Sequence, residues 1–216
     1  MVNELKLWEV LFQRALTLVD DARARGLAVE DWTFGGGTVL MRRHRHRLSK
    51  DIDIFVNDPP YLGYLTPRLS AAAEALTTDY VEDHNFVKLA FPEGEIDFVA
   101  SAPLTENPAR TETLFGRPFL VETSAEILAK KIWHRSELFT ARDLFDLAAV
   151  AELEPEALGP IAPILCDRRG AVLARIERDG PQLRETFESL RALEYRRSFD
   201  ECVDVVRAAL AGTPSR

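Results

Sequence analysis

Two short stretches decide the fold of this chain: FGGGT at residues 34–38 and SKDIDIF at residues 49–55. Successive side chains of a strand point to opposite faces, so the second stretch predicts a strand with an apolar face and a face that carries Asp51 and Asp53. The apolar side chains are Ile52, Ile54 and Val56. The two carboxylates lie about 6.5 Å apart at their Cα atoms, because a strand rises ~3.3 Å per residue. Their oxygens can converge on Mg²⁺, which prefers oxygen ligands and keeps room for substrate phosphates.

The glycine run predicts a tight turn between a short strand at residues 32–34 and a short helix at residues 38–42. Without a Cβ, Gly36 and Gly37 let backbone N–H groups approach a phosphate, and the N-terminus of the following helix adds a favourable dipole. We therefore expect Gly36, Gly37 and Thr38 to hold a nucleoside triphosphate beside the carboxylate pair.

A dense basic run, RRHRHRLSK at residues 42–50, separates the glycine turn from the carboxylates. A solvated loop is the simplest interpretation of such a run. Its position between two phosphate-related motifs favours contact with phosphate, for which arginine is well suited. We include Arg47 and Ser49 among the expected nucleotide-binding residues.

The order glycine turn, short helix, Asp-x-Asp strand resembles the DNA-polymerase-β-type nucleotidyltransferase superfamily. The resemblance implies an α+β catalytic core with a mixed sheet, and a third carboxylate supplied by a neighbouring strand. Asp97, between Ile96 and Phe98, matches that pattern. Three carboxylates can hold two cations about 3.5–4 Å apart, an arrangement that stabilises an in-line phosphoryl displacement. Asp97 could also help to deprotonate the acceptor hydroxyl, although a solvent-facing Asp beside Glu95 is the alternative.

The remaining apolar patterns predict the framework around these motifs. The expected elements are a helix at residues 3–25 ended by Gly26, a helix at 61–76, a hairpin of strands at 86–91 and 95–100, and a strand at 119–121. Residues 124–211 are almost wholly helical in pattern. Breaks are expected near Pro155, Gly159-Pro160, Gly170 and Gly180-Pro181. A capping box at Thr123–Glu126 is expected to begin this part. We therefore expect a catalytic domain at residues 1–122 and a C-terminal helical bundle at residues 123–216.

Two helical motifs add a second resemblance. EILAKKI at residues 126–132 and ARDLFDL at residues 141–147 follow the glycine turn and SKDID in order. This set is similar to the AbiEii/AbiGii-type nucleotidyltransferase toxins of bacterial toxin–antitoxin systems. The resemblance implies that Lys131 and Asp143 are functional, with the neighbouring Lys130 as an alternative for the lysine. It also implies a cognate antitoxin, and a tRNA 3′ end or a protein as acceptor.

Helical spacing supports the same residues independently. Lys131 and Arg135 share a helix face at i and i+4, and form a cationic pair suited to triphosphate oxygens. Asp143 and Asp146 share a face at i and i+3. A lattice of salt bridges between two helices is the alternative, in which Asp143 orients Lys131. Lys130 is expected nearer to solvent. The stripe expected to pack in the core is Ile127, Leu128, Ile132 and Leu138.

Composition limits the class of protein. The 216 residues carry a net charge of −8, which argues against wholesale coating of nucleic acid but permits local docking of RNA. Apolar runs are shorter than the ~18 residues of a membrane span, and we see no signal peptide. Cys166 and Cys202 are expected to be reduced thiols, although a disulfide is possible. These features predict a cytoplasmic protein without a membrane partner.

Together the motifs predict a bacterial Mg²⁺-dependent nucleotidyltransferase toxin that modifies a tRNA or a protein. It would transfer a nucleoside monophosphate from an NTP and release pyrophosphate. The metal ligands would be Asp51, Asp53 and Asp97. Two alternatives stay open: a nucleotidyltransferase acting on a small molecule such as an antibiotic, and a nucleotide-binding module without turnover.

Overall fold

The computed structural model describes residues 4–25 and 32–212, which fall into two compact units. The sheet unit contains Met1–Val39, Ser49–Pro103 and Ala109–Glu122. The helical unit contains Leu40–Leu48, Leu104–Pro108 and Thr123–Arg216. Two segments that precede the expected boundary after residue 122, 40–48 and 104–108, therefore belong to the helical unit.

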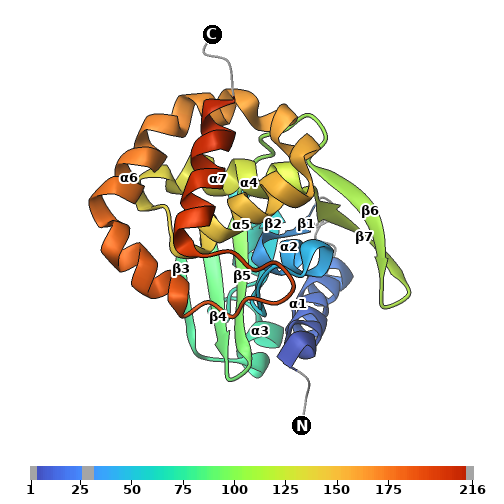
Figure 1. Ribbon diagram of the computed structural model, residues 1–216. Coiled ribbons are helices and arrows are strands. Elements are labelled where there is room, and N and C mark those ends of the chain that lie inside the picture. The colour runs from blue at the N-terminus through green and yellow to red at the C-terminus, as the bar shows by residue number, and fades with distance from the viewer. Residues whose placement is uncertain (1–3, 26–31, 213–216) are drawn as a thin grey trace. The chain divides into compact units, whose positions relative to one another are not determined.

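The sheet unit is built on a seven-stranded sheet in the order β3-β4-β5-β2-β1-β7-β6 (Figure 1). The strands are β1 Thr33–Gly35, β2 Ile52–Val56, β3 Tyr80–Asp83, β4 Phe86–Phe91, β5 Gly94–Ala100, β6 Ala109–Leu114 and β7 Arg117–Glu122. β2 pairs with β5 and β1 with β7 in parallel, whereas the other neighbours are antiparallel. The predicted mixed sheet of an α+β fold is confirmed.

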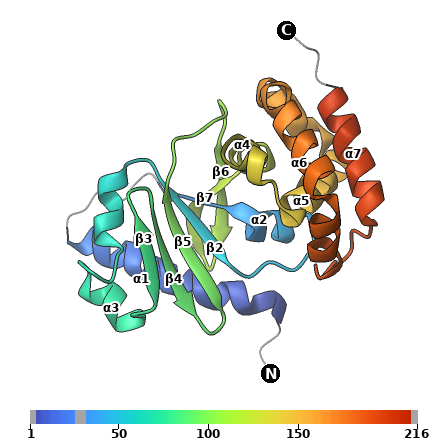
Figure 2. The same cartoon turned by 90° about the vertical axis from the view of Figure 1, so that its left-hand side faces the viewer.

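One face of the sheet is apolar and is covered by α1, Leu7–Ala24, which runs along it (Figure 2). The rings of Phe12 on α1 and Phe34 on β1 lie 4.6 Å apart at their centroids. Phe34 is in register with Ile54, and Ile54 with Phe98, so these buried side chains share the face toward α1. The expected N-terminal helix is confirmed, while its expected C-cap, Gly26, lies outside the described residues. A 3₁₀ turn, Glu4–Lys6, precedes α1.

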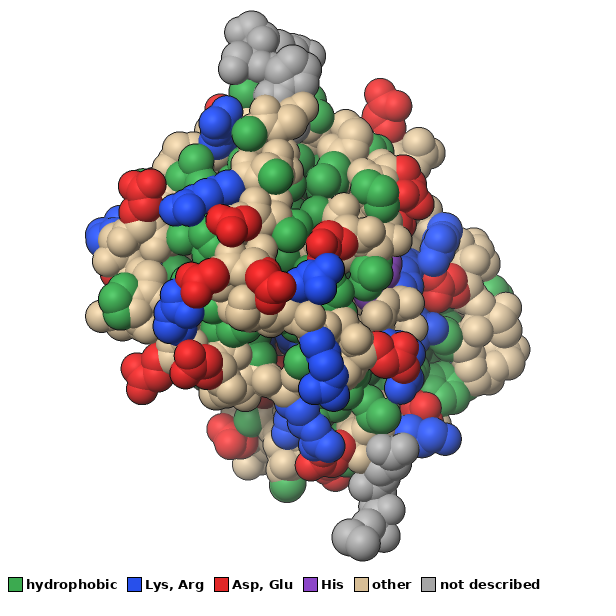
Figure 3. Space-filling view, in the orientation of Figure 1, with side chains coloured by type: hydrophobic (Ala, Val, Ile, Leu, Met, Phe, Trp, Pro, Cys, Tyr) green, Lys and Arg blue, Asp and Glu red, His purple; other side chains and the backbone are tan. Residues whose placement is uncertain are grey.

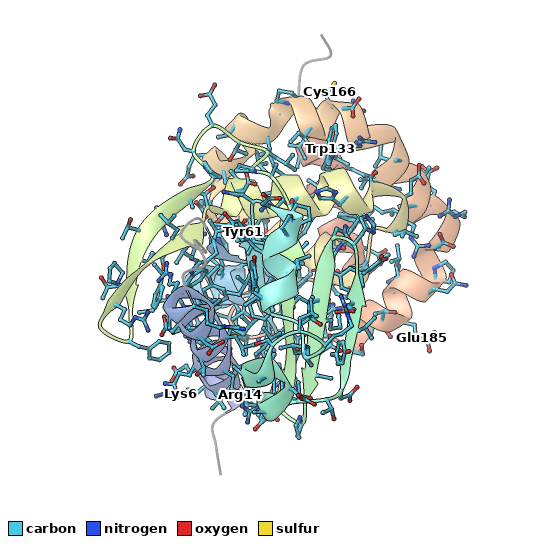
Figure 4. All side chains as sticks on the ribbon, turned by 180° about the vertical axis from the view of Figure 1, so that it is seen from behind. Lys6, Arg14, Tyr61, Trp133, Cys166 and Glu185 are labelled. Carbon is cyan, nitrogen blue, oxygen red and sulfur yellow. The ribbon has the colours of Figure 1, made fainter. Side chains whose placement is uncertain are left out.

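The expected helix at residues 61–76 is wrong. The chain instead forms a 3₁₀ helix, η2 (Pro59–Tyr64), and a separate short helix, α3 (Ala71–Leu76). Tyr61, labelled in Figure 4, lies on η2. Pro67 disfavours the helical conformation of the residue before it, and Ser70 caps α3 by accepting a hydrogen bond from Ala73 N.

The predicted hairpin is confirmed as β4 and β5, whereas two strands were missed. β3 extends the sheet beyond β4, and β6 pairs with β7 in a hairpin at the opposite edge (Figure 1). The strand expected at residues 119–121 is the middle of β7.

The helical unit consists mainly of long helices. They are α4 Ser124–Arg135, α5 Ala141–Leu153, α6 Ala162–Glu188 and α7 Phe199–Ala211, with 3₁₀ turns η3 Ser136–Leu138 and η4 Pro155–Ile161. α7 packs against α5 and α6. The helix α2, Gly36–His44, begins in the sheet unit and ends in the helical unit.

The helix breaks were predicted with mixed success. Pro155 and Gly159-Pro160 fall in η4, as expected, but Gly170 lies inside α6. The expected break near Gly180-Pro181 is present as a kink that divides α6 into two helical parts, where Asp179 has the non-helical angles φ −116° and ψ 20°. Leu138 was expected in the core but is 70% exposed.

Thr123 caps α4 as predicted, but the reciprocal half of the capping box is replaced. The Thr123 side chain accepts a hydrogen bond from Glu126 N at 3.2 Å. The Glu126 carboxylate accepts bonds from the backbone N–H groups of Leu104 and Thr105 instead, at 3.0 and 2.9 Å. It thereby ties the segment 104–108 to α4.

On the face shown in Figure 3, acidic and basic side chains are interspersed with apolar ones. The two cysteines are free thiols; Cys202 is buried and Cys166 partly exposed. Within the described residues, no helix is long and apolar enough to cross a membrane.

Candidate active site

One row of residues crosses four neighbouring strands on the sheet face opposite α1. Gly35 on β1 is in register with Asp53 on β2, Asp53 with Asp97 on β5, and Asp97 with Lys88 on β4. Residues in register on adjacent strands point to the same face. We call these four residues the acidic row. The structure thus brings together Asp53 and the predicted third carboxylate, Asp97.

Two glycines where β1 leads into α2 allow carboxylates to approach the backbone. A Cβ on Gly36 would lie 1.9 Å from Asp53 Oδ2, and Gly36 has φ 72°, which L side chains rarely adopt. A Cβ on Gly35 would lie 2.2 Å from Oε2 of the buried Glu122. Gly36 and Gly37 form the first turn of α2 rather than a separate turn before it. The N-terminus of α2 therefore lies directly beside Asp53.

Thr38 ties α2 to the approach to β2. Its buried hydroxyl donates to the carbonyl oxygen of Asp51 at 2.6 Å and lies 3.1 Å from Ser49 Oγ. These contacts hold the glycine turn beside the carboxylates. The role of Thr38 and Ser49 in nucleotide binding stays a prediction.

Asp51 is anchored to the start of β5. Its Oδ1 accepts a hydrogen bond from Glu95 N at 3.1 Å. A Cβ on the neighbouring Gly94, where φ is 153°, would lie 2.8 Å from the same oxygen. Across residues 4–25 and 32–212, no group of three or more His, Cys, Asp or Glu side chains is already gathered as a metal site. The role of Asp51 as a metal ligand stays a prediction.

Asp97 carries the clearest electrostatic signature of the sheet unit. Burial and the negative charge of Asp53 raise its pKa to about 6, and Lys88 opposes the rise. Asp97 Oδ1 is buried and accepts no hydrogen bond from the described residues. Two facing carboxylates with an unmatched oxygen fit a divalent cation that prefers oxygen ligands.

A second cluster, which we call the ion-pair network, lies within the helical unit. It consists of His46, Arg47, Lys131, Asp143 and Asp146. Lys131 Nζ lies 2.6 Å from Asp143 Oδ1 and 3.1 Å from Asp146 Oδ2. Arg47 donates through Nε and Nη2 to the two oxygens of Asp146, at 2.6 and 2.8 Å. The expected pairing of Lys131 with Asp143, and the shared face of the two aspartates, are present.

The ion-pair network is buried and balanced in charge. Burial tends to raise the pKa of Asp146, but Arg47 and Lys131 outweigh it and hold that pKa well below its usual value. Burial tends to lower the pKa of Lys131, but Asp143 and Asp146 outweigh this effect. The pKa is raised above its usual value, so the ammonium stays charged. Burial lowers the pKa of His46, so its neutral ring donates from Nε2 to Asp146 at 2.7 Å. The network therefore holds charged groups in fixed positions.

This geometry bears on the expectations for two basic residues, Lys130 and Arg47. Lys130 is buried, 3.6 Å from Glu126, so its expected position nearer to solvent is wrong. Arg47 is 3% exposed and donates from Nε and Nη2 to the two oxygens of Asp146, a buried contact that holds the ion-pair network together. Its assignment as a nucleotide ligand stays a prediction. The sequence patterns predicted no role for Lys88 or Glu122, and they included His46 only as a member of the basic run.

The fold and the acidic row define the class of this protein. A mixed sheet that carries Asp-x-Asp and a facing Asp, beside a helix led by glycines, is the arrangement that the resemblance to nucleotidyltransferases predicted, and solved nucleotidyltransferases share the fold. A putative nucleotidyltransferase from H. pylori aligns with a TM-score of 0.56 and 14% identity, over 98% of this chain and 95% of that chain. MenT4, a nucleotidyltransferase toxin from Mycobacterium tuberculosis H37Rv, aligns with a TM-score of 0.55 and 18% identity, over 96% of this chain and 83% of that chain.

The sequence assigns the family more narrowly. The family model described as nucleotidyl transferase AbiEii toxin, type IV toxin–antitoxin system, matches residues 18–211. This chain belongs to that family, and the predicted resemblance is confirmed. A search of curated protein sequences gave no match. Membership supports a toxin with nucleotidyltransferase activity and an NTP as substrate.

Proposed function

We propose that this nucleotidyltransferase transfers a nucleoside monophosphate from an NTP to a hydroxyl of a tRNA 3′ end or of a protein, and releases pyrophosphate. The observation that carries the proposal is the facing pair of Asp53 and Asp97. Oδ1 of Asp97 accepts no hydrogen bond from the described residues. Asp53 on β2 lies beside the N-terminus of α2, where phosphate oxygens can accept from the N–H groups of Gly36 and Gly37.

Asp51, Asp53 and Asp97 would hold Mg²⁺. When bound, it would neutralise charge on the triphosphate and on the attacking and leaving oxygens. The carboxylates supply the hard oxygen ligands that this cation requires. Thr38 and Ser49 would keep α2 and the carboxylates in fixed relation through the contact of Thr38 with the Asp51 carbonyl.

In the proposed reaction, the acceptor oxygen forms a bond to the α-phosphorus, and the bond from that phosphorus to the bridging oxygen breaks. Pyrophosphate leaves with the electron pair. Asp97 would help to take the proton of the acceptor hydroxyl, because a base with a pKa of about 6 is suited to work near neutral pH. Lys131, held by Asp143 at 2.6 Å, would stabilise the charge that develops on the leaving pyrophosphate.

The family supports a cognate antitoxin of the type IV kind. We propose that such an antitoxin controls this chain, and that both act in the cytoplasm, where two free thiols remain reduced.

The test is incubation of the purified protein with Mg²⁺, total cell RNA or protein, and each NTP labelled at its α-phosphate. We expect label in a tRNA or protein band, and pyrophosphate in proportion. Asp53→Asn should lower the rate about 1,000-fold, because losing a metal ligand removes several kcal/mol of transition-state stabilisation at 1.36 kcal/mol per tenfold.

The other outcomes separate the rival functions. Pyrophosphate release only with added aminoglycosides would identify a small-molecule transferase. NTP binding without pyrophosphate in any extract would identify a binding module. A folded Asp53→Asn variant with wild-type turnover would overturn the assignment of the metal site.

A further inference from the structure

Lys88 supplies the positive charge of the acidic row. It lies on β4 directly opposite Asp97 in the antiparallel β4–β5 pair. Its Nζ is 2.7 Å from Glu95 Oε2 and 3.4 Å from Asp97 Oδ2. The ammonium is thus shared between one carboxylate of the facing pair and a second carboxylate beside it.

The Asp53–Asp97 pair needs a cation. Two carboxylates on adjacent strands repel each other unless a positive charge lies close by. Lys88 reaches Asp97 Oδ2, whereas the buried Asp97 Oδ1 accepts no hydrogen bond from the described residues. The neutralisation that Lys88 provides is therefore partial, and leaves an oxygen for another cation.

We propose that Lys88 is a tethered counter-ion that neutralises Asp97 in the metal-free protein and shifts to Glu95 when a divalent cation binds the Asp53–Asp97 pair. The inference rests on the metal-dependent function proposed above. The shorter of the two contacts of Lys88 is already the one to Glu95, so the ammonium keeps a partner after leaving Asp97.

Two consequences follow for Lys88. It competes with the divalent cation for Asp97 and therefore weakens the affinity for that cation. It also stabilises the metal-free sheet unit, because it offsets the repulsion between the two carboxylates.

The test is Mn²⁺ binding, followed by the electron paramagnetic resonance signal of free Mn²⁺, together with the thermal midpoint in EDTA. Lys88→Met should bind Mn²⁺ about fivefold more tightly, from ~1 kcal/mol for a solvent-accessible ion pair at 1.4 kcal/mol per tenfold. Its midpoint in EDTA should fall. Lys88→Arg should restore both values. Arg110→Met, which removes the same charge from an ion pair with Glu112, should leave both near wild type.

Unchanged or weaker Mn²⁺ affinity in Lys88→Met would overturn the role of Lys88. If Asp97→Asn loses Mn²⁺ in that case, the proposed metal site still stands. Wild-type Mn²⁺ affinity in Asp97→Asn would overturn both.

A second measurement needs no loss of Lys88. In the wild-type protein with ¹³C-labelled lysine, Mg²⁺ should move the Cε signal of Lys88, assigned by its absence in Lys88→Arg. The signal of Lys6 on the 3₁₀ turn before α1 should not move. A Lys88 signal that ignores Mg²⁺ would also overturn the inference.

Discussion

The two units of this protein each contain a cluster of charged side chains. The clusters differ in how far their carboxylates are paired with cations. In the ion-pair network of the helical unit, both oxygens of Asp146 accept from Arg47, and Lys131 lies within 3.1 Å. In the acidic row of the sheet unit, Asp97 faces Asp53 and has Lys88 at 3.4 Å. The carboxylates of the first cluster are paired with cations, whereas Asp97 Oδ1 in the second accepts no hydrogen bond from the described residues.

The pKa values follow this difference. The pKa of Asp146 is held well below its usual value, although the group is buried, because cations surround it. The pKa of Asp97 is raised to about 6 by burial and by Asp53. A satisfied buried network fixes the positions of helices, whereas a perturbed carboxylate with an unmatched oxygen is typical of a site that binds a ligand. The comparison therefore separates the carboxylates of a satisfied network from the carboxylates that we propose as metal ligands.

The largest effect should come from breaking the network. Asp146→Ala removes the carboxylate that accepts two hydrogen bonds from the buried Arg47 and leaves Lys131 with Asp143, so the free energy of unfolding should fall by about 3–5 kcal/mol. Urea denaturation at pH 7 measures it. Asp204→Ala is the matched control, because Asp204 is exposed on α7 and lies 4.0 Å from Arg207. A change below about 1 kcal/mol, which is usual for an exposed pair, would show that the network is not a source of stability.

The next prediction separates Lys131 from Lys130 on the same helix. Lys131→Ala should lower kcat about 10²–10³-fold, the usual cost of losing one group that stabilises transition-state charge. It should change the KM for NTP less, because that charge develops on the leaving pyrophosphate. Lys130→Ala removes an ion pair with Glu126 and should affect stability more than kcat.

Both lysine variants need a check of folding by circular dichroism, since Lys131 belongs to the network. Lys131→Arg keeps the charge and provides the rescue. If Lys130→Ala were inactive and Lys131→Ala worked normally, the assignment of the functional lysine would be wrong.

The pH dependence of stability should have opposite signs in the two clusters. Asp97 has a folded pKa of about 6 against an ordinary value of 3.8, so the folded state binds more protons between these values. Its contribution to stability is therefore present below about pH 4 and lost as the pH rises through about 6. The loss amounts to about 3 kcal/mol, at 1.36 kcal/mol per pKa unit. Asp146, with a lowered pKa, contributes above its ordinary value of 3.8 and loses that contribution as the pH falls.

Asp97→Asn tests this sign without metal. Measured in urea with EDTA, its stability relative to wild type should rise by about 3 kcal/mol from pH 4 to pH 8. Saturating Mg²⁺ should stabilise the wild-type protein and leave Asp97→Asn almost unchanged. A relative stability that is flat with pH would mean that the charge of Asp97 is already compensated.

The sequence was informative where one local pattern sufficed. The alternation in β2 placed Asp53 on the polar face because the opposite face is buried, and this reading is confirmed. The register of the β4–β5 hairpin was also accessible, since a turn that pairs Phe91 with Gly94 places Lys88 opposite Asp97. That signal was available and unused.

Other features had no local signal. β3 and β6 are edge strands with one neighbour each, and their exposed residues, such as Val81 at 58%, give no apolar face to recognise. Arg47 and Asp146 are 99 residues apart in sequence, so their pairing depends on tertiary packing. From the sequence, the members of the basic run at residues 42–50 therefore could not be told apart, although Arg45 is exposed and Arg47 is buried.

The smallest predicted effect concerns two members of that run, Arg45 and Arg47. Arg45 is exposed, pairs with the exposed Glu194, and has φ 48° just after α2 ends. Arg45→Ala should cost less than about 1 kcal/mol, because an exposed ion pair contributes little and Ala adopts the same strained φ. Arg45→Gly should instead gain up to about 1 kcal/mol, because glycine adopts positive φ without the Cβ penalty. Arg47→Ala should lower the free energy of unfolding several times more than Arg45→Ala does, since it removes a buried partner of Asp146.

Urea denaturation of the three variants measures these differences. Equal losses in Arg45→Ala and Arg47→Ala would mean that burial does not distinguish them, and the contrast between a satisfied network and a solvated charge would fail at its simplest case.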